Sequence, residues 1–415
     1  MNRMPKKPHD VDGLVEAAAR SGTPTVVYDE MMIRDRCAAL RSAISSVPSK
    51  LLYALKANSN PALIRILLEE VDGFDAVSPG EVMLLLKLGA RPEQIMFSPN
   101  YMTDSEMANA VERDVLLNLG ELTRLERFGK AYPGSNVSIR LNLWLGAGHH
   151  EYVVTGGQNS KFGIPATQLD EAAAIAGRHG LRIVGLHQHI GSGFSNVQDF
   201  ADAVDLLIEA SKMFPEAEFL NVGGGIGIPY RADEAACDLD AMARYIEIAA
   251  NRPELKSEFW FEPGRFLVAE SGVLLTTVTA VKQSGKRTYA GTDSGFNHLI
   301  RPVLYGAHHE IFNLSNPTGP LLPYDVAGNI CESGDVFARD RHVQEIREGD
   351  LLAILDVGAY GVSMASEYNM RPLPEEVLRK ADGTSSTIRK RLTPTELVER
   401  VILETDGRSN KGDAG

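Results

Sequence analysis

Short apolar runs alternate with amphipathic stretches from about residue 50 to residue 265. The runs have the length of buried strands, and the stretches between them, such as "PALIRILLEEV", repeat apolar residues with the period of a helix. This alternation predicts parallel strands joined by right-handed crossovers. The predicted strands are "LLYALK" (51–56), "GFDAVS" (73–78), "IMFSPN" (95–100), "VLLNLG" (115–120), "VSIRLNL" (137–143), "RIVGLHQH" (182–189), "FLNVGGG" (219–225) and "FWFEPG", which ends at Gly264.

Eight strand–helix units favour an α/β fold of the closed (β/α)8 type, a TIM barrel. The alternative is an open, doubly wound sheet. Polar residues at the strand ends favour the barrel, because its functional groups gather there.

The pattern changes after residue 265, where "GVLLTTVTAVKQ" and "DLLAILDVGAYG" are β-rich and turn signals such as "REGD" separate the runs. We expect a second, mostly antiparallel β domain, and the early run "PTVVYD" (24–29) is a candidate to pair with it. The predicted domains are a barrel over 30–285, a β domain formed by 1–29 plus 286–405, and a disordered tail over 406–415.

Composition narrows the classes of partner. The chain has 415 residues, 44% of them hydrophobic, and a formal net charge of −13. A strongly acidic chain is a poor partner for nucleic acid, and no stretch approaches the about 20 apolar residues that span a bilayer. We therefore predict neither a nucleic-acid nor a membrane partner, and the start, "MNRMPKKPHDVDG", lacks the apolar core of a secretory signal.

The three cysteines, Cys37, Cys237 and Cys331, are far apart in the sequence. They have no zinc-type spacing, and an odd, sparse set suits a reducing compartment. The sequence therefore predicts a cytoplasmic protein with no metal site.

Polar residues stand at or near the end of each predicted barrel strand. Because function in such barrels lies at the carboxyl ends of the strands, we expect them to face one basin. They are Lys56, Asp75, Ser98, Asn100, Asn118, Asn142, His187, His189 and Glu262, with the glycine run "GGGIG" (223–227).

The glycine run follows the seventh strand, where barrels of this kind bind phosphate through bare backbone N–H groups. It departs from the G-x-G-x-x-G pattern, which disfavours a dinucleotide site. A lysine, a histidine, a carboxylate and a phosphate loop in one basin indicate a phosphorylated aldehyde held by the lysine. Pyridoxal 5′-phosphate is the cofactor that fits this set.

Several longer motifs resemble those of the fold-type III pyridoxal-phosphate-dependent decarboxylases, and within them the diaminopimelate decarboxylase family. The likeness runs from "PTVVYD" to "RPLPEEVL". It rests on "YALKAN", "GFDAVSPGE", "TGGQNSKFGI", "HIGSG", "GGGIGIPY", "EPGRFLVAESGVL", "RPVLYGAHH", "CESGDVF" and "GAYGVSMASEYNMRP". The resemblance implies an alanine racemase-like barrel with a β domain. It also implies a homodimer whose active sites join the barrel of one subunit to the β domain of the other.

The resemblance also implies roles at the cofactor. Lys56 would hold pyridoxal phosphate as an imine, His189 would stack on its ring, and Glu262 would contact the ring nitrogen. The predicted cofactor-binding set is Lys56, Asp75, His189, Ser192, Gly223, Gly224, Gly225, Glu262, Gly264, Arg265 and Tyr360.

The resemblance also implies a set of residues that bind the substrate, a diamino acid with a second, distal carboxylate. A bidentate guanidinium suits such a carboxylate. Cys331 would be provided by the partner subunit to protonate the carbanion. It completes the predicted catalytic set with Lys56 and His189. The predicted substrate-binding residues are Arg265, Arg301, Tyr305, Glu332 and Tyr360.

The implied activity is decarboxylation of meso-2,6-diaminopimelate to L-lysine and CO2. The alternative is a related decarboxylase of ornithine, lysine, carboxynorspermidine or a siderophore precursor. The motifs "RPVLYG" and "EPGR" weigh against this alternative, because enzymes for simple diamino monocarboxylates have no distal carboxylate to bind. An amino-acid racemase is disfavoured by Glu262, since related racemases have arginine in that role, and a non-catalytic pyridoxal-phosphate carrier is disfavoured by the β domain.

Overall fold

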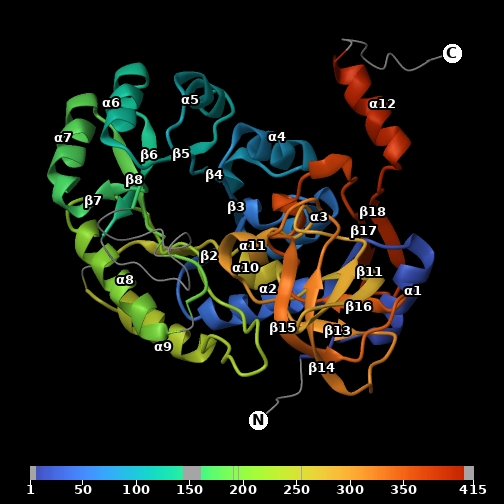
Figure 1. Cartoon of the computed structure of the whole chain (residues 1–415). Helices are drawn as coiled ribbons and strands as arrows, with labels where there is room; N and C mark the ends of the chain where they lie inside the picture. Colours follow the sequence, from blue (N-terminus) through green and yellow to red (C-terminus); the bar gives the residue numbers. More distant parts are fainter. Residues whose placement is uncertain (1–5, 144–159, 190, 195, 254, 406–415) are drawn as a thin grey trace. The chain divides into compact units, whose positions relative to one another are not determined.

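The eight predicted strands form a closed parallel barrel in the computed structural model of the chain (Figure 1). The structure describes residues 6–143, 160–189, 191–194, 196–253 and 255–405. Around the barrel the strands run in the order β2, β3, β4, β5, β6, β8, β9 and β10, and β10 pairs with β2 to close it. They are β2 (Ser49–Ala54), β3 (Gly73–Ala76), β4 (Ile95–Phe97), β5 (Leu116–Leu119), β6 (Asn136–Asn142), β8 (Arg182–His187), β9 (Phe219–Asn221) and β10 (Glu258–Phe261). The predicted barrel is confirmed.

Helices follow the strands as the pattern predicts. The barrel strands are short and buried on both faces, as parallel strands covered by helices must be. A two-residue strand, β7 (Ile164–Pro165), adds to β6 outside the ring. The helices of this unit are α2 (Glu30–Ile44), α3 (Pro61–Glu70), α4 (Pro79–Leu88), α5 (Asp104–Val111), α6 (Leu122–Ala131), α7 (Leu169–His179), α8 (Val197–Ser211), α9 (Leu239–Ala250) and α10 (Arg265–Val268), with 3-10 turns η1 (Leu55–Ala57), η2 (Pro92–Gln94) and η4 (Ala166–Gln168).

Contacts between Cα atoms divide the chain into two units. The barrel unit comprises 31–229 and 233–269, and the β unit comprises 1–30, 230–232 and 270–415. By this division β11 lies in the β unit, whereas the predicted boundary at residue 285 placed it with the barrel. The reason is its pairing: β11 bonds to β1, β12 and β16, all of the β unit.

The β unit is built on a mostly antiparallel sheet, as predicted. The run 24–29 forms β1, which pairs antiparallel with β11 and parallel with β17. The elements of the unit are α1 (Val11–Ser21), β1 (Thr25–Asp29), β11 (Gly272–Ser284), β12 (Arg287–Thr292), α11 (Arg301–Tyr305), β13 (Ile311–Asn313), β14 (Leu321–Ala327), β15 (Val336–Gln344), β16 (Leu351–Ile354), η5 (Val362–Met364), η6 (Tyr368–Met370), β17 (Glu375–Arg379), β18 (Ser385–Arg389) and α12 (Pro394–Thr405). Its apolar core joins α1 to the sheet through Leu14, Val27, Leu275, Phe312 and Val377.

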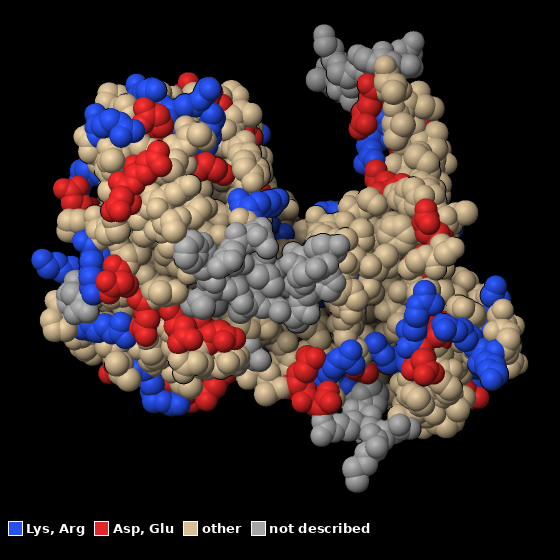
Figure 2. All heavy atoms as spheres, turned by 60° about the vertical axis from the view of Figure 1, so that its left-hand side comes forward, with Lys and Arg blue, Asp and Glu red and all other residues tan. Residues whose placement is uncertain are grey.

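Charged side chains of both signs are interspersed on the face drawn in Figure 2. No helix among the described residues is long and apolar enough to cross a membrane.

Candidate active site

Lys56 lies in η1, the single turn that follows β2, rather than in the strand itself. Its Nζ is 3.1 Å from Asp75 Oδ2 in β3. The Asp75 carboxylate is 1% exposed, while the Lys56 side chain is 35% exposed. Two neighbouring strand ends therefore place an ammonium group over a buried carboxylate, with the lysine still accessible from the barrel mouth.

The turn after Lys56 is held by local hydrogen bonds. Tyr53 donates its hydroxyl to Asn58 O at 2.9 Å, and Asn60 N donates to Asn58 Oδ1 at 3.0 Å. Asn60 then caps α3 by accepting from Ala62 N at 2.9 Å, as its place before a proline predicts. These bonds order the backbone directly after the lysine.

His189 lies beyond β8 and contacts the glycine loop. Gly224 N donates to His189 Nδ1 at 3.1 Å, so this nitrogen is an acceptor and the ring's other nitrogen carries the proton. Burial, and then the positive charge of Lys56, lower the pKa of His189 to about 3. The imidazole is therefore neutral at physiological pH, as a ring that stacks on an aromatic cofactor can be.

Glu262 follows β10 and is 2% exposed. Its Oε1 lies 3.0 Å from His187 Nε2, and its Oε2 accepts from Asn221 Nδ2 at 3.2 Å. Burial raises the pKa of Glu262, but His187 and Lys56 outweigh burial and hold the pKa near 2. Glu262 is therefore an ionised carboxylate inside the barrel.

The glycine loop adopts a backbone that other residues tolerate poorly. Gly223 and Gly225 have φ of 79° and 98°, and a Cβ on Gly224 would overlap the carbonyl oxygen of Glu262. Two of the loop's amides are already used: Gly223 N donates to Asn221 Oδ1 at 2.8 Å, and Gly224 N donates to His189. The predicted phosphate contact by all three glycines stays a prediction.

Ser192 and Arg265 lie together. Arg265 Nη2 and Nε donate to Ser192 Oγ at 2.8 and 3.2 Å. Because Oγ accepts from the guanidinium, the serine's own proton is directed elsewhere and can be donated to an anion. Gly264, just before Arg265, serves packing: a Cβ there would lie 2.8 Å from Ala57 Cβ, in the turn that carries Lys56.

Arg140 in β6 belongs to the same electrostatic group, and sequence reasoning did not select it. Burial lowers its pKa, while Glu262 and Asp75 favour its charge. Its guanidinium lies 4.6 Å from the centroid of the Phe162 ring. The available signal was a charged residue inside the otherwise mostly buried strand "VSIRLNL".

The predicted substrate residues lie in the β unit. Arg301, in α11, is 1% exposed, with its Nη1 2.7 Å from His309 Nε2 and its Cζ 4.8 Å from the Tyr230 ring centroid. His309 Nδ1 donates to Leu355 O at 2.8 Å, which makes Nε2 the acceptor for Arg301. Tyr305 ends the same helix.

Cys331 and Glu332 are exposed on a loop with defined contacts. Asp335 accepts from Ile330 N at 2.7 Å, Cys331 N donates to Asn369 Oδ1 at 2.8 Å, and Tyr368 donates its hydroxyl to Glu332 Oε1 at 3.2 Å. The loop presents both side chains to solvent in this chain. Tyr360 is half-buried, with a φ of 57° that is unusual for a tyrosine.

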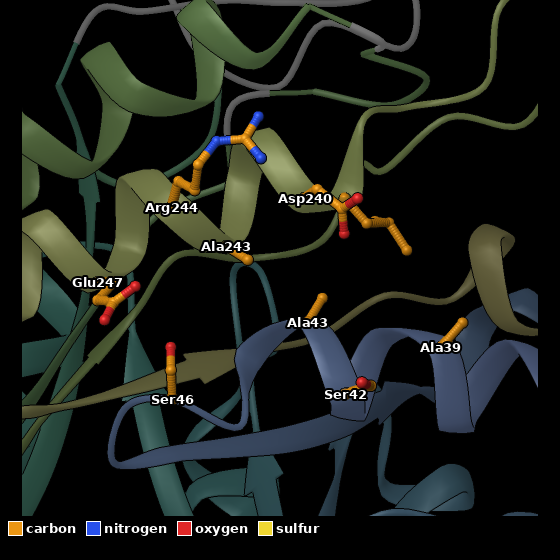
Figure 3. Close-up of a pocket in the computed structure, with 9 residues that line it drawn as sticks. Ala39, Ser42, Ala43, Ser46, Asp240, Ala243, Arg244 and Glu247 are labelled. Atoms are coloured by element: carbon orange, nitrogen blue, oxygen red, sulfur yellow. The ribbon is translucent and has the colours of Figure 1, made fainter.

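A cavity of about 530 Å³ lies outside the barrel, between α2 and α9 (Figure 3). Asp240, Arg244 and Glu247 line one side, and none of the predicted site residues lies there. In the described part of the chain, no cluster of three histidine, cysteine or carboxylate residues could hold a metal.

Comparisons with known proteins agree on the kind of site. A model of the pyridoxal-dependent decarboxylase family, described as its pyridoxal binding domain, matches residues 30–269. The diaminopimelate decarboxylase of Methanothermobacter thermautotrophicus is 42% identical over 402 residues, 92% of each chain. That of Escherichia coli K12 is 36% identical over 417 residues, 94% of this chain and 97% of its own. A crystal structure of diaminopimelate decarboxylase from Helicobacter pylori complexed with L-lysine is 33% identical with a TM-score of 0.87, and covers 95% of this chain and 100% of that one.

The family model covers more than half of the chain, so the chain is a pyridoxal-dependent decarboxylase, and its barrel carries the lysine, histidine and glutamate described above. Within the class it belongs to the diaminopimelate decarboxylase family.

The residues present fit the cofactor of this class, pyridoxal 5′-phosphate. Asp75 Oδ1 is buried and accepts no hydrogen bond among the described residues, so the site keeps an uncompensated acceptor beside Lys56. A positively charged or proton-donating group is what such an oxygen requires.

Proposed function

We propose that this chain decarboxylates meso-2,6-diaminopimelate at its D-configured centre to give L-lysine and CO2. The observation that carries the substrate assignment is Arg301, a fully buried guanidinium oriented by His309 and Tyr230. The planar guanidinium offers paired N–H donors, and a carboxylate can accept from both of them.

Each predicted residue of the barrel would have a separate role in holding the cofactor. Lys56 Nζ would hold the cofactor's aldehyde carbon, and Asp75 would keep the lysine over the barrel mouth. Ser192 and the backbone after Gly224 would bind the phosphate. His189 would cover one face of the ring, and Glu262 would keep a proton on its nitrogen. When bound, pyridoxal 5′-phosphate supplies an electron-withdrawing ring that accepts the electron pair released as CO2 leaves.

The remaining steps concern the substrate. Arg301 and Tyr305 would hold its distal carboxylate, and Glu332 its distal ammonium. The Cys331 thiol would return a proton to the carbon that lost CO2. Because Cys331 and Glu332 are exposed on an ordered loop, we propose that a partner subunit's barrel receives them in a homodimer. Three free cysteines fit a reducing compartment, so the proposed location is the cytoplasm.

The test is product analysis. Purified protein with pyridoxal 5′-phosphate would be incubated separately with meso-diaminopimelate, both enantiomers of lysine and ornithine, and carboxynorspermidine, while CO2 and amine are measured. We expect lysine and CO2 from meso-diaminopimelate alone. Turnover of a monocarboxylate would keep the decarboxylase chemistry and overturn the role of Arg301.

An arginine variant makes the assignment specific. Arg301→Gln should raise KM for meso-diaminopimelate by about 10- to 100-fold, the effect of losing one charge-assisted pair. Arg287→Gln, an exposed arginine of the same unit, is the control. Equal KM values in the two variants would contradict the proposal.

A further inference from the structure

The polar side chains under Glu262 form a chain of hydrogen bonds whose direction is set at the Asn221 end. At one end, Gly223 N donates to Asn221 Oδ1 at 2.8 Å. A backbone N–H can only donate, so the Asn221 amide is fixed with its Nδ2 toward Glu262 Oε2. Glu262 Oε2 is therefore an acceptor.

At the other end, Asn118 of β5 lies against His187. The Asn118 amide lies 3.2 Å from Ser138 Oγ, 3.1 Å from Ser98 Oγ and 2.7 Å from His187 Nδ1. Ser138 Oγ also donates to Gly185 O at 3.1 Å, and a hydroxyl has one proton, so either atom of the Asn118 amide can face His187. On its other side, His187 Nε2 lies 3.0 Å from Glu262 Oε1.

The hydrogen bond to His187 decides what Glu262 can do. Because an ionised carboxylate only accepts hydrogen bonds, His187 Nε2 is the donor. This bond favours the ionised form of Glu262 and holds Oε1 in place. His187 and Glu262 are both about 2% exposed, so water does not screen that charge.

We propose that His187 is a positioning residue of the reaction: in contact with Asn118 at Nδ1, it donates from Nε2 to Glu262 and keeps that carboxylate ionised and in place for the protonated ring nitrogen of the cofactor. This inference rests on the proposed function, because it assigns Glu262 to the ring nitrogen. It makes His187, through Glu262, a determinant of the ring's electron-withdrawing strength.

The test compares two variants in the holoenzyme. His187→Leu removes the donor at similar volume, and His187→Gln keeps an uncharged N–H donor. The first readout is the 15N chemical shift of cofactor labelled at its ring nitrogen, recorded without substrate. We expect a protonated nitrogen in wild type and His187→Gln, and a shift toward the unprotonated form in His187→Leu. The matched control is His298→Leu, a buried histidine of the β unit that should leave this signal unchanged.

The kinetic readout separates positioning from folding. His187→Leu should lose kcat by about 10- to 100-fold, the worth of a hydrogen bond to a charged group, with KM changed less than about twofold. An unchanged ring-nitrogen signal in His187→Leu would overturn the proposal. So would 15N shifts showing that wild-type His187 carries no proton on Nε2, a measurement that stands even if the leucine variant does not fold.

These outcomes are distinct from failure of the proposed function. If wild type decarboxylates a different amino acid, the resting ring-nitrogen signal and its response to His187→Leu still decide the role of His187. If the substrate assignment holds and that signal does not respond, only the role of His187 fails.

Discussion

At the scale of single residues, the site consists of charges that are stabilised by their neighbours. Asp75 lies beside Lys56, and Glu262 lies beside His187. Both carboxylates are buried, and the neighbouring side chain favours the ionised form of each. Such pairs are costly to break, because the remaining charge stays buried without compensation. The network therefore couples cofactor chemistry to the stability of the barrel.

Lys56→Ala should abolish the visible absorbance of the bound cofactor and reduce turnover to background, because no other amine replaces it at the barrel mouth. The matched control is Lys50→Ala, in β2 itself, where the ammonium pairs with Glu258 at 3.0 Å outside the proposed site. Absorbance titration with pyridoxal phosphate and a turnover assay measure both. Retention of the visible band in Lys56→Ala would remove the lysine from its proposed role.

His189 gives a pH dependence of stability. Its pKa is about 3 in the folded protein, against 6.5 for an ordinary histidine. Between these values the unfolded chain binds a proton that the folded protein does not, so stability falls as pH drops from 6.5 toward 3. The slope from this residue is up to about 1.4 kcal/mol per pH unit. Urea unfolding of the apoprotein at several pH values should show a shallower acid-side slope in His189→Phe than in wild type, and equal slopes would contradict the shift.

Residues at strand ends could be predicted, whereas the bonds between them could not. Lys56, Asp75 and Glu262 stand out in the sequence because each is a charged residue in or next to an apolar run. Burying a charge there is costly unless a partner or a function compensates. Asn221 ends a strand as they do, yet an asparagine there is commonly a turn or cap residue. The hydrogen bonds of His187 and His189 depend on Asn118, Glu262 and Gly224, which lie in or just after β5, β10 and β9 and are far apart in the sequence.

At the scale of elements, the loop after β9 depends on its lack of side chains. Gly223 and Gly225 need positive φ, and the Cα of Gly224 packs against the Glu262 carbonyl. The loop is also tied to its neighbours, since Gly223 O accepts from Glu262 N at 3.0 Å and Gly225 O accepts from Gly193 N at 2.9 Å. Moving the loop would therefore displace both the Glu262 backbone and the segment that carries Ser192.

Gly224→Ala should weaken pyridoxal phosphate binding by at least about tenfold and destabilise the fold by about 1–3 kcal/mol, because the new methyl group overlaps backbone that cannot retreat. Gly177→Ala in α7 is the matched control. A Cβ there meets nothing within 4 Å, and alanine should stabilise that helix by about 0.5–1 kcal/mol. Cofactor titration and thermal unfolding measure both variants, and wild-type affinity in Gly224→Ala would contradict the loop's proposed role.

The strands of the barrel were predictable because each is a buried apolar run with turn signals on both sides. β7 was not, since two residues carry no period. The end of the barrel unit could not be predicted from local pattern, because β11 begins with an apolar run, "GVLL", and its pairing with β1 and β16 is what places it in the β unit. Local pattern predicts an element, and long-range pairing decides the unit to which it belongs.

At the scale of the whole molecule, the predicted residues fall into two sets in two units. Lys56, His189 and Glu262 lie in the barrel unit, while Arg301 and Cys331 lie in the β unit. In the proposed homodimer, each active site would use residues of both subunits. It would combine the barrel of one subunit with Cys331 of the other.

Mixing two inactive variants tests this arrangement. Lys56→Ala disables the barrel contribution, and Cys331→Ala disables the loop contribution. In a heterodimer of the two, one composite site carries both substitutions and the other carries neither. Random assortment makes half of the dimers mixed, so coexpression should restore about a quarter of wild-type activity per chain. Coexpression of wild type with Lys56→Ala, which should give about half, controls for expression and assembly. If each active site were built within one chain, every site in the mixture would keep one defect, and activity would stay at the average of the two variants measured alone.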